Sequence, residues 1–199
     1  MENNVIAVSG GSFNPPTNAH IDLAKQILKE YTIIDRIIFV PVSTKYNKDG
    51  LAPDIERYNM LKKVCESNKK MEVSSIELDT EKQLYTIETL NKIQEQNPNK
   101  KVAFILGTDN LKELPTWHNV EKLLETYKIL VIKRNNDNIQ KIIEENSTLL
   151  KYKNSFIKLK NIKQIDLRST EIREKVKNNE DITNLVPEEI INDIKRIYK

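Results

Sequence analysis

The chain has 199 residues, 38% of them hydrophobic, which is enough for one well-cored domain. Lys and Arg (32) nearly balance Asp and Glu (29), so the net charge of +3 gives no support for a nucleic-acid-binding surface. A single cysteine excludes an internal disulfide framework, and two histidines argue against a zinc site built from the usual ligands.

The sequence has no basic segment followed by a long apolar run at its N-terminus, and no stretch approaches the roughly 18 apolar residues of a membrane span. We therefore expect a cytoplasmic protein with no membrane partner. Residues 1–199 contain no repeat and no low-complexity linker, so we expect them to form a single domain.

Short apolar runs alternate with segments of helical period along the chain. In chain order we expect a strand at 5–8, a helix at 19–29, a strand at 37–40, a helix opened by Pro53-Asp54, a strand at 71–73, a helix at 86–96, a strand at 102–106, a helix at 120–124, and strands at 129–132 and 156–159. Two helices close the chain, one beginning near Ser169 and one near Pro187. This order predicts a Rossmann-like, doubly wound parallel α/β sheet with a C-terminal helical extension, whose ligands bind at the carboxyl ends of the strands.

Some side chains have predicted places within these elements. The helix after Pro53 is expected to turn Ile55, Met60, Leu61 and Val64 inward. Thr86 is expected to cap the helix at 86–96, and the lone Cys65 is expected to be a buried, unreactive side chain.

The turn after the first strand carries the first functional signal. Gly10 and Gly11 have no side chains, so a ligand can approach the backbone amides closely, and the next helix begins within ten residues. His20 falls in the first turn of that helix, so glycines, amides and an imidazole converge as a phosphate site requires. The sequence is not a Walker loop, and a tight turn with a structural histidine is the alternative.

Residues 11–20, Gly-Ser-Phe-Asn-Pro-Pro-Thr-Asn-Ala-His, resemble the signature of the class I nucleotidyltransferase superfamily, Gly-Ser/Thr-Phe-Asp/Asn-Pro-x-His/Thr-x-Gly-His. The one departure is Ala19, which replaces the usual glycine. The resemblance implies that His20 hydrogen-bonds the α-phosphate of ATP and that Thr17 contacts the same phosphates. It also implies that backbone amides near Ser12 and Phe13 hold the incoming nucleotide or the transferred phosphoryl group.

Residues 167–173, Leu-Arg-Ser-Thr-Glu-Ile-Arg, resemble the Ile-Ser-Ser-Thr-x-Ile-Arg motif of the same superfamily. Physically the segment is a helix N-terminus with hydroxyls at its cap and an arginine one turn later. The resemblance implies that Ser169, Thr170 and Arg173 hold the β- and γ-phosphates. Arg168 replaces the first serine of the motif, and an ordinary capped helix is the alternative for this segment alone.

Gly107-Thr108-Asp109 follows the strand at 102–106. Acidic residues at strand ends accept hydrogen bonds from ribose in dinucleotide sites, and Asp109 is a candidate for that contact. A turn-capping aspartate explains the local sequence equally well. In the resembled family this position serves the ATP ribose or adenosine.

Three further features resemble the pyridine-nucleotide branch of the superfamily, the nicotinate or nicotinamide mononucleotide adenylyltransferases. Residues 84–90, Leu-Tyr-Thr-Ile-Glu-Thr-Leu, match its Tyr-Thr-x-x-Thr-Leu stretch, and Gly-x-Asp is followed by Leu-x-x-Trp. Pro41-Val42 leads through Tyr46 and Lys48 to Gly50-Leu51 and then to Arg57, as in members with a Pro-Val-x-x-x-Tyr-x-Lys-x-Gly-Leu loop. The resemblance implies that Trp117, with the backbone at Tyr85 and Thr86, meets the pyridine ring. Lys48, with help from Arg57, would meet the mononucleotide phosphate.

The expected reaction is transfer of the adenylyl group of ATP to nicotinate or nicotinamide mononucleotide in NAD biosynthesis, with Mg²⁺ held mainly by the ATP phosphates. No metal ligands from the protein are expected, and the sequence is compatible with a homo-oligomer. The choice between the two mononucleotides stays open. Pantetheine-phosphate adenylyltransferase is the nearest alternative enzyme, and the departures at Ala19 and Arg168 leave room for a catalytically weak nucleotide-sensing module.

Overall fold

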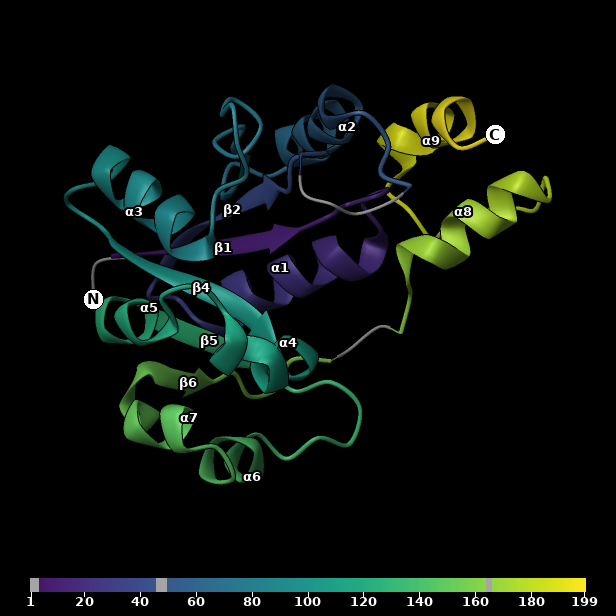
Figure 1. Cartoon of the computed structure of the whole chain (residues 1–199). Helices are drawn as coiled ribbons and strands as arrows, with labels where there is room; N and C mark the ends of the chain where they lie inside the picture. Colours follow the sequence, from purple (N-terminus) through teal and green to yellow (C-terminus); the bar gives the residue numbers. More distant parts are fainter. Residues whose placement is uncertain (1–3, 46–49, 164–165) are drawn as a thin grey trace.

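The computed structural model describes residues 4–45, 50–163 and 166–199 (Figure 1). Within them, the strands form one sheet in which every pair is parallel, with the order β3-β2-β1-β4-β5-β6. The strands are β1 (Val5–Gly11), β2 (Ile34–Pro41), β3 (Met71–Val73), β4 (Lys101–Gly107), β5 (Lys128–Ile132) and β6 (Phe156–Lys158). The strand order reverses direction between β1 and β4, as a doubly wound sheet requires, and this point is where such sheets bind ligands. The predicted fold class is confirmed.

Helices cover both faces of the sheet and give two apolar cores. The α-helices are α1 (Asn18–Glu30), α2 (Asp54–Glu66), α3 (Thr86–Gln96), α4 (Thr108–Glu113), α5 (Val120–Thr126), α6 (Ile139–Glu144), α7 (Ser147–Lys151), α8 (Ser169–Lys177) and α9 (Ile191–Ile197). The short 3₁₀ turns are η1 (Leu114–Thr116), η2 (Lys153–Ser155) and η3 (Glu188–Ile190). One core packs against α1, α2, α8 and α9, and the other against α3 to α7.

The alternation of side chains along β1 explains this division. Ala7 points into the first core, while Ile6 and Val8 point into the second. Both faces of a central parallel strand are buried, so the strand reads as a continuous apolar run. The C-terminal helices α8 and α9 lie beyond the carboxyl end of β1 (Figure 1). They bring the last residues of the chain to the side of the sheet where the strands end.

Two predictions about α2 and α3 are wrong. Ile55 is 62% exposed, and the inward face of α2 carries Arg57 instead, together with Met60 and Leu61. Thr86 is the first helical residue of α3, and the cap is Tyr85, whose backbone N–H donates to the Glu88 carboxylate at 2.8 Å. Both helices are present at the predicted positions, and the errors concern only which residue is buried in α2 and which residue caps α3.

Other differences are shifts of boundary or omissions. β1 extends through Gly11, so the two glycines belong to the strand, and β2 begins at Ile34. Pro187 precedes η3, and α9 follows it only at Ile191. The helices α4, α6 and α7 were not predicted from the sequence. Cys65 is buried as expected, and burial raises the pKa of its thiol to about 12. Among the described residues, no helix is long and apolar enough to cross a membrane.

Candidate active site

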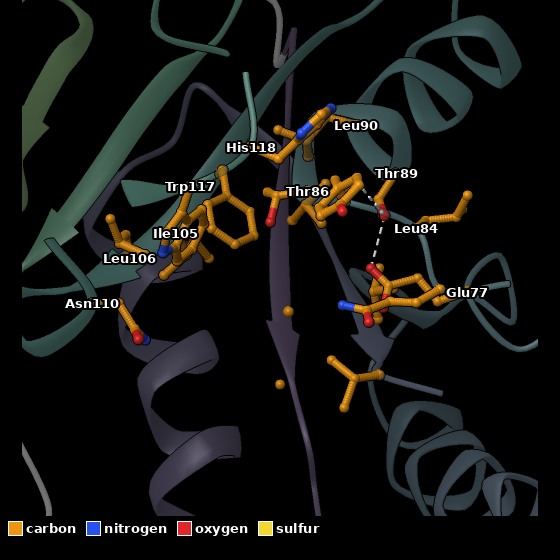
Figure 2. A pocket seen from close by; sticks show the side chains of 18 of the residues that line it. Glu77, Leu84, Thr86, Thr89, Leu90, Ile105, Leu106, Asn110, Trp117 and His118 are labelled. Carbon is orange, nitrogen blue, oxygen red and sulfur yellow. Dashed lines mark hydrogen bonds between the residues drawn. The ribbon is translucent and has the colours of Figure 1, made fainter. Parts of the chain in front are cut away.

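A cavity of about 560 Å³ lies at the carboxyl ends of the central strands, where the strand order reverses (Figure 2). Gly10 and Gly11 line it at the end of β1. Figure 2 shows Trp117 and Ile105 on one side of the cavity and Glu77 on the other. The cavity therefore stands at the place that the doubly wound topology provides for a ligand, and it has the size of a small-molecule site.

The first loop, residues 12–17, has an unusual backbone. Phe13 has φ 44°, a left-handed conformation that a bulky residue adopts only where its surroundings enforce it. Its buried ring packs edge-to-face against His20 and Phe39, with centroids 5.2 and 5.6 Å away. A Cβ on Gly11 would lie 3.1 Å from the same ring, so glycine makes room for it. The peptide bond before Pro15 is cis.

His20 is held in a defined orientation by Thr17, the N-cap of α1. The Thr17 backbone N–H donates to Nδ1 of the imidazole at 3.0 Å, and the Thr17 hydroxyl lies 2.7 Å from the same nitrogen. Because Nδ1 accepts these bonds, the neutral ring carries its proton on Nε2. Desolvation and the positive charge of Arg134 lower the pKa of His20 to about 4, so the ring is neutral near pH 7.

The segment 167–173 meets the first loop directly. The Ser169 hydroxyl donates to the Pro15 carbonyl at 2.8 Å, and the Arg173 guanidinium donates to the Asn14 carbonyl, also at 2.8 Å. Arg173 also lies 3.4 Å from the Thr170 hydroxyl. These residues stand in the first turns of α8, so the N-terminus of this helix and that of α1 flank the same loop. Two helix N-termini beside one loop favour a polyanionic ligand.

Gly107 ends β4, the strand next to β1, and Asp109 lies two residues further on, in the first turn of α4. Asp109 is exposed and forms an ion pair with Arg134 at 3.4 Å. A Cβ on Gly107 would lie 2.4 Å from the Asp109 carboxylate and 2.5 Å from Arg134 Nε, so a larger residue would displace both side chains. The backbone of Arg134 is fixed by its N–H bond to the Thr108 hydroxyl at 2.9 Å. This arrangement places a carboxylate and a guanidinium at adjacent strand ends.

Aromatic side chains line the part of the cavity near the start of α3 and the turn after η1. Trp117, after η1, lines it and packs edge-to-face on Phe104 with centroids 6.2 Å apart. Tyr85, at the cap of α3, stacks on His118 at 4.0 Å and 20° between the ring planes. The stack joins the start of α3 to the turn before α5, and Figure 2 shows His118 and Thr86 at the same end of the cavity. Flat side chains here suit an aromatic ring as ligand.

Glu77 is a carboxyl group in the wall of this cavity. It accepts a hydrogen bond from the Thr89 hydroxyl of α3 at 2.7 Å, drawn in Figure 2. Burial raises the pKa of the Glu77 carboxyl to about 7, against the opposing effect of the Thr89 hydrogen bond. The cavity wall therefore contains a carboxyl group that changes charge near neutral pH.

Arg57 is fully buried, and each guanidinium nitrogen has a protein partner. It donates to the carbonyls of Ala52, Ser12 and Val42 at 2.9, 2.8 and 2.6 Å, and to the Asp54 carboxylate at 2.5 Å. It thus ties the first loop to the β2–α2 loop, residues 42–45 and 50–53. Direct contact of Arg57 with a mononucleotide phosphate stays a prediction. Lys48 and Tyr46 lie outside the described residues.

The structure thus brings together candidates that are far apart in sequence. Gly10, Gly11 and Ser12 meet Tyr85, Thr86 and Trp117 around one cavity, while Ser169 and Arg173 contact the first loop beside His20. Sequence reasoning missed Arg134 and Glu77. Arg134 could have been found, because it follows a predicted strand at its carboxyl end, whereas Glu77 carries no comparable signal. Within the described residues, no three His, Cys, Asp or Glu side chains are grouped as a metal site would need.

The comparisons with known proteins agree with this geometry. A family model described as cytidylyltransferase-like matches residues 8–175, which include both the first loop and the α8 motif. A protein of Fusobacterium nucleatum named probable nicotinate-nucleotide adenylyltransferase is 38% identical over 195 residues, with 97% of this chain and 98% of that protein covered. The chain belongs to the nicotinate-nucleotide adenylyltransferase family.

Other members of the nicotinate-nucleotide adenylyltransferase family match along a similar length. A protein of Clostridium acetobutylicum with the same name is 36% identical, and the match covers 96% of each chain. Among solved structures, a nicotinic acid mononucleotide adenylyltransferase of Plasmodium falciparum complexed with NaAD superposes with a TM-score of 0.76 at 23% identity, covering 97% of this chain and 95% of that one. The same protein complexed with APC gives a TM-score of 0.75. At this identity the structural match shows the shared fold.

Proposed function

We propose that the protein transfers the adenylyl group of ATP to nicotinate mononucleotide, in the step of NAD biosynthesis that forms the dinucleotide. The observation that carries this proposal is the junction of the two motifs: Ser169 and Arg173 bond to the carbonyls of Pro15 and Asn14, next to His20. An aromatic cavity adjoins the same loop. We prefer nicotinate to nicotinamide as the acceptor because relatives that match along nearly their whole length carry the nicotinate name.

In the proposed reaction a phosphate oxygen of the mononucleotide attacks the α-phosphorus of ATP. A new P–O–P bond forms, the bond between the α- and β-phosphates breaks, and pyrophosphate leaves with the electron pair. Both reactants are anionic, so positioning and charge neutralisation supply most of the rate. Nε2–H of His20 donates to an α-phosphate oxygen, and Thr17 holds the ring in the tautomer that makes this possible.

Each end of ATP has its own contacts in this proposal. Ser169, Thr170 and Arg173 hold the β- and γ-phosphates at the N-terminus of α8, where the helix dipole and the guanidinium both favour negative charge. Asp109 accepts hydrogen bonds from the ribose hydroxyls, exchanging its ion pair with Arg134 for them. Backbone amides of Ser12 and Phe13 hold the phosphoryl group that is transferred.

The acceptor occupies the aromatic end of the cavity. The pyridine ring packs on Trp117, and backbone N–H groups at the start of α3, around Tyr85 and Thr86, meet its carboxylate. Lys48 binds the mononucleotide phosphate, with Arg57 supporting the loop that carries it. We expect the reaction to take place in the cytoplasm, and a homo-oligomeric state stays a prediction.

Magnesium is expected to enter with ATP. We expect the triphosphate and water to hold most of its coordination positions. When bound, it would neutralise charge on the leaving pyrophosphate. The protein then contributes hydroxyls and a guanidinium rather than carboxylates around these phosphates.

The experiment that tests the proposal measures the adenylylated product and pyrophosphate formed from MgATP with nicotinate mononucleotide, nicotinamide mononucleotide or 4′-phosphopantetheine. We expect the highest kcat/KM with nicotinate mononucleotide and equal amounts of the two products. A preference for nicotinamide mononucleotide would overturn the acceptor assignment, and turnover only with 4′-phosphopantetheine would overturn the branch. Binding of ATP with no turnover on any acceptor would identify a sensing module.

A further inference from the structure

Asn14 occupies the centre of the first loop and is 4% exposed. Its side-chain amide makes contacts to two other parts of the chain. Nδ2 donates to the Gly50 carbonyl at 2.8 Å, and Oδ1 accepts from the Ala52 backbone N–H at 2.9 Å. Both partners belong to the β2–α2 loop, so one side chain joins this loop to the first loop.

A third contact comes from the end of the chain. The hydroxyl of Tyr198, the residue after α9, donates to Asn14 Oδ1 at 2.7 Å, and this bond is buried. Desolvation raises the pKa of Tyr198, so the hydroxyl keeps its proton and can act only as the donor towards this oxygen. Two donors then face Oδ1 and one acceptor faces Nδ2, which determines the orientation of the amide.

The backbone of Asn14 is held as well. Its carbonyl accepts the Arg173 guanidinium at 2.8 Å, and Arg57 links the carbonyl of Ser12, two residues earlier, to Val42 and Ala52. Asn14 therefore connects three segments that the proposed function gives to different substrate groups: the first loop, the β2–α2 loop and α8. A buried amide bonded through both its oxygen and its nitrogen favours one arrangement of the surrounding backbone.

We propose that Tyr198 is a positioning residue for the adenylyl transfer: its hydroxyl fixes the amide of Asn14, and the amide in turn holds the β2–α2 loop in register with the first loop and α8. This inference rests on the proposed function for its kinetic consequences. Catalysis by positioning requires the acceptor phosphate and the α-phosphorus to stay within about 0.5 Å of their productive arrangement. Small displacements of a supporting loop therefore lower the rate or the affinity. The C-terminal helix thus serves the reaction without touching a substrate.

The test compares Tyr198→Phe with Tyr152→Phe. The Tyr152 hydroxyl bonds to Glu121 and Glu125 on the opposite side of the sheet, so its removal controls for loss of a tyrosine hydroxyl. In Tyr198→Phe we expect KM for the mononucleotide to rise about fivefold, the factor expected for one neutral hydrogen bond, while KM for ATP stays within twofold. In Tyr152→Phe both constants should match the wild type. Equal changes of both constants in Tyr198→Phe, or none, would overturn the inference.

A double-mutant cycle shows whether Tyr198 acts through Asn14. Adding Tyr198→Phe to Asn14→Ala should change the mononucleotide KM by less than twofold, because the oxygen that receives the hydroxyl is already absent. A full fivefold effect in that background would contradict the proposed route.

A second measurement does not depend on activity or on the folding of the Asn14 variant. Hydrogen exchange of the Ala52 backbone amide should be about fivefold faster in Tyr198→Phe than in the wild type, with exchange in β4 unchanged. An unchanged Ala52 rate would overturn the inference. If the wild type forms no dinucleotide, the proposed function fails, whereas an active wild type with unaltered Tyr198→Phe kinetics overturns only the role of Tyr198.

Discussion

The Ser169 hydroxyl donates a hydrogen bond to the carbonyl of Pro15 at 2.8 Å, although 154 positions separate the two residues. This bond brings the N-terminus of α8 against the loop that carries His20. A doubly wound sheet makes the meeting possible, because the carboxyl end of β1 and the helices that follow the last strand reach the same edge. The two segments that we propose to bind the triphosphate are therefore brought together by topology.

Ser169→Ala removes this bond, and with it a hydroxyl that could exchange the Pro15 carbonyl for a phosphate oxygen of ATP. We expect KM for ATP to rise about five- to tenfold, since a net hydrogen bond is worth about 1 kcal/mol and bonds to charged groups somewhat more. KM for the mononucleotide should change little. Ser155→Ala is the matched control, because the Ser155 hydroxyl also donates to a carbonyl, that of Leu124, away from the cavity. Steady-state kinetics measure KM for ATP in both variants. The same KM for ATP in Ser169→Ala and Ser155→Ala would contradict the role of Ser169.

Trp117→Ala should act on the other substrate. Loss of the indole removes the flat apolar surface that lines the cavity opposite Glu77, so KM for the pyridine nucleotide should rise by at least tenfold while KM for ATP stays within about twofold. Initial rates with each substrate varied in turn measure this difference. If both constants increase to the same extent, Trp117 is not part of the ring site.

Arg57→Met separates a structural role from a substrate contact. Removing a fully buried guanidinium takes the donor from three backbone carbonyls and leaves the Asp54 carboxylate only its bonds from Ser43 and Thr44. We expect the free energy of unfolding to fall by about 3 kcal/mol. Urea denaturation measures this loss. Unchanged stability combined with a raised KM for the mononucleotide would show instead that Arg57 contacts the acceptor.

The protonation of His20 gives a pH prediction for the free enzyme. Because its pKa is lowered from 6.5 to about 4, the unfolded chain binds more protons between these values, and the folded state gains stability as pH rises through that window. This contribution is complete above pH 6.5 and is lost as pH falls through about 4. The chain has two histidines, so NMR titration with His20→Gln for assignment can follow each ring. A His20 resonance that titrates near pH 6.5 would contradict the neutral ring.

Arg134 is the charged neighbour that lowers this pKa after desolvation. Arg134→Met should therefore move the pKa of His20 upward, towards its ordinary value, without changing the bond from Thr17. Lys133→Met changes the neighbouring exposed residue and serves as the control. The same NMR titration measures both variants, and an unmoved His20 pKa in Arg134→Met would show that desolvation alone accounts for the shift.

The sheet was predictable because its strands are short, buried apolar runs that end in turn residues, as β4 does at Gly107. The helices α4, α6 and α7 have only five or six residues each, so no helical period can be read from them. The inward Arg57 was not predictable either. Helical spacing puts Arg57 on the face of Met60 and Leu61, but a charge is not expected in a core, and the loop carbonyls that satisfy it cannot be read from sequence.

The candidate site was predictable where a local motif carries the chemistry, as it does for His20 and for the hydroxyls of α8. The network around Asn14 was not, because its bonds join residues 36 and 184 positions apart and no local pattern encodes such a meeting. For His20, the sequence predicts the position in the first turn of α1 but not the tautomer of the ring. The tautomer depends on the backbone N–H of Thr17, which donates to Nδ1.

The central claim is that His20 stabilises the transferring phosphoryl group between the two motifs. The most direct measurement is pyrophosphate release by His20→Ala, with MgATP binding measured on the same protein. We predict that turnover falls by about 100- to 1,000-fold while the affinity for ATP stays within a fewfold of the wild type. Pyrophosphate release close to the wild-type rate would contradict the claim.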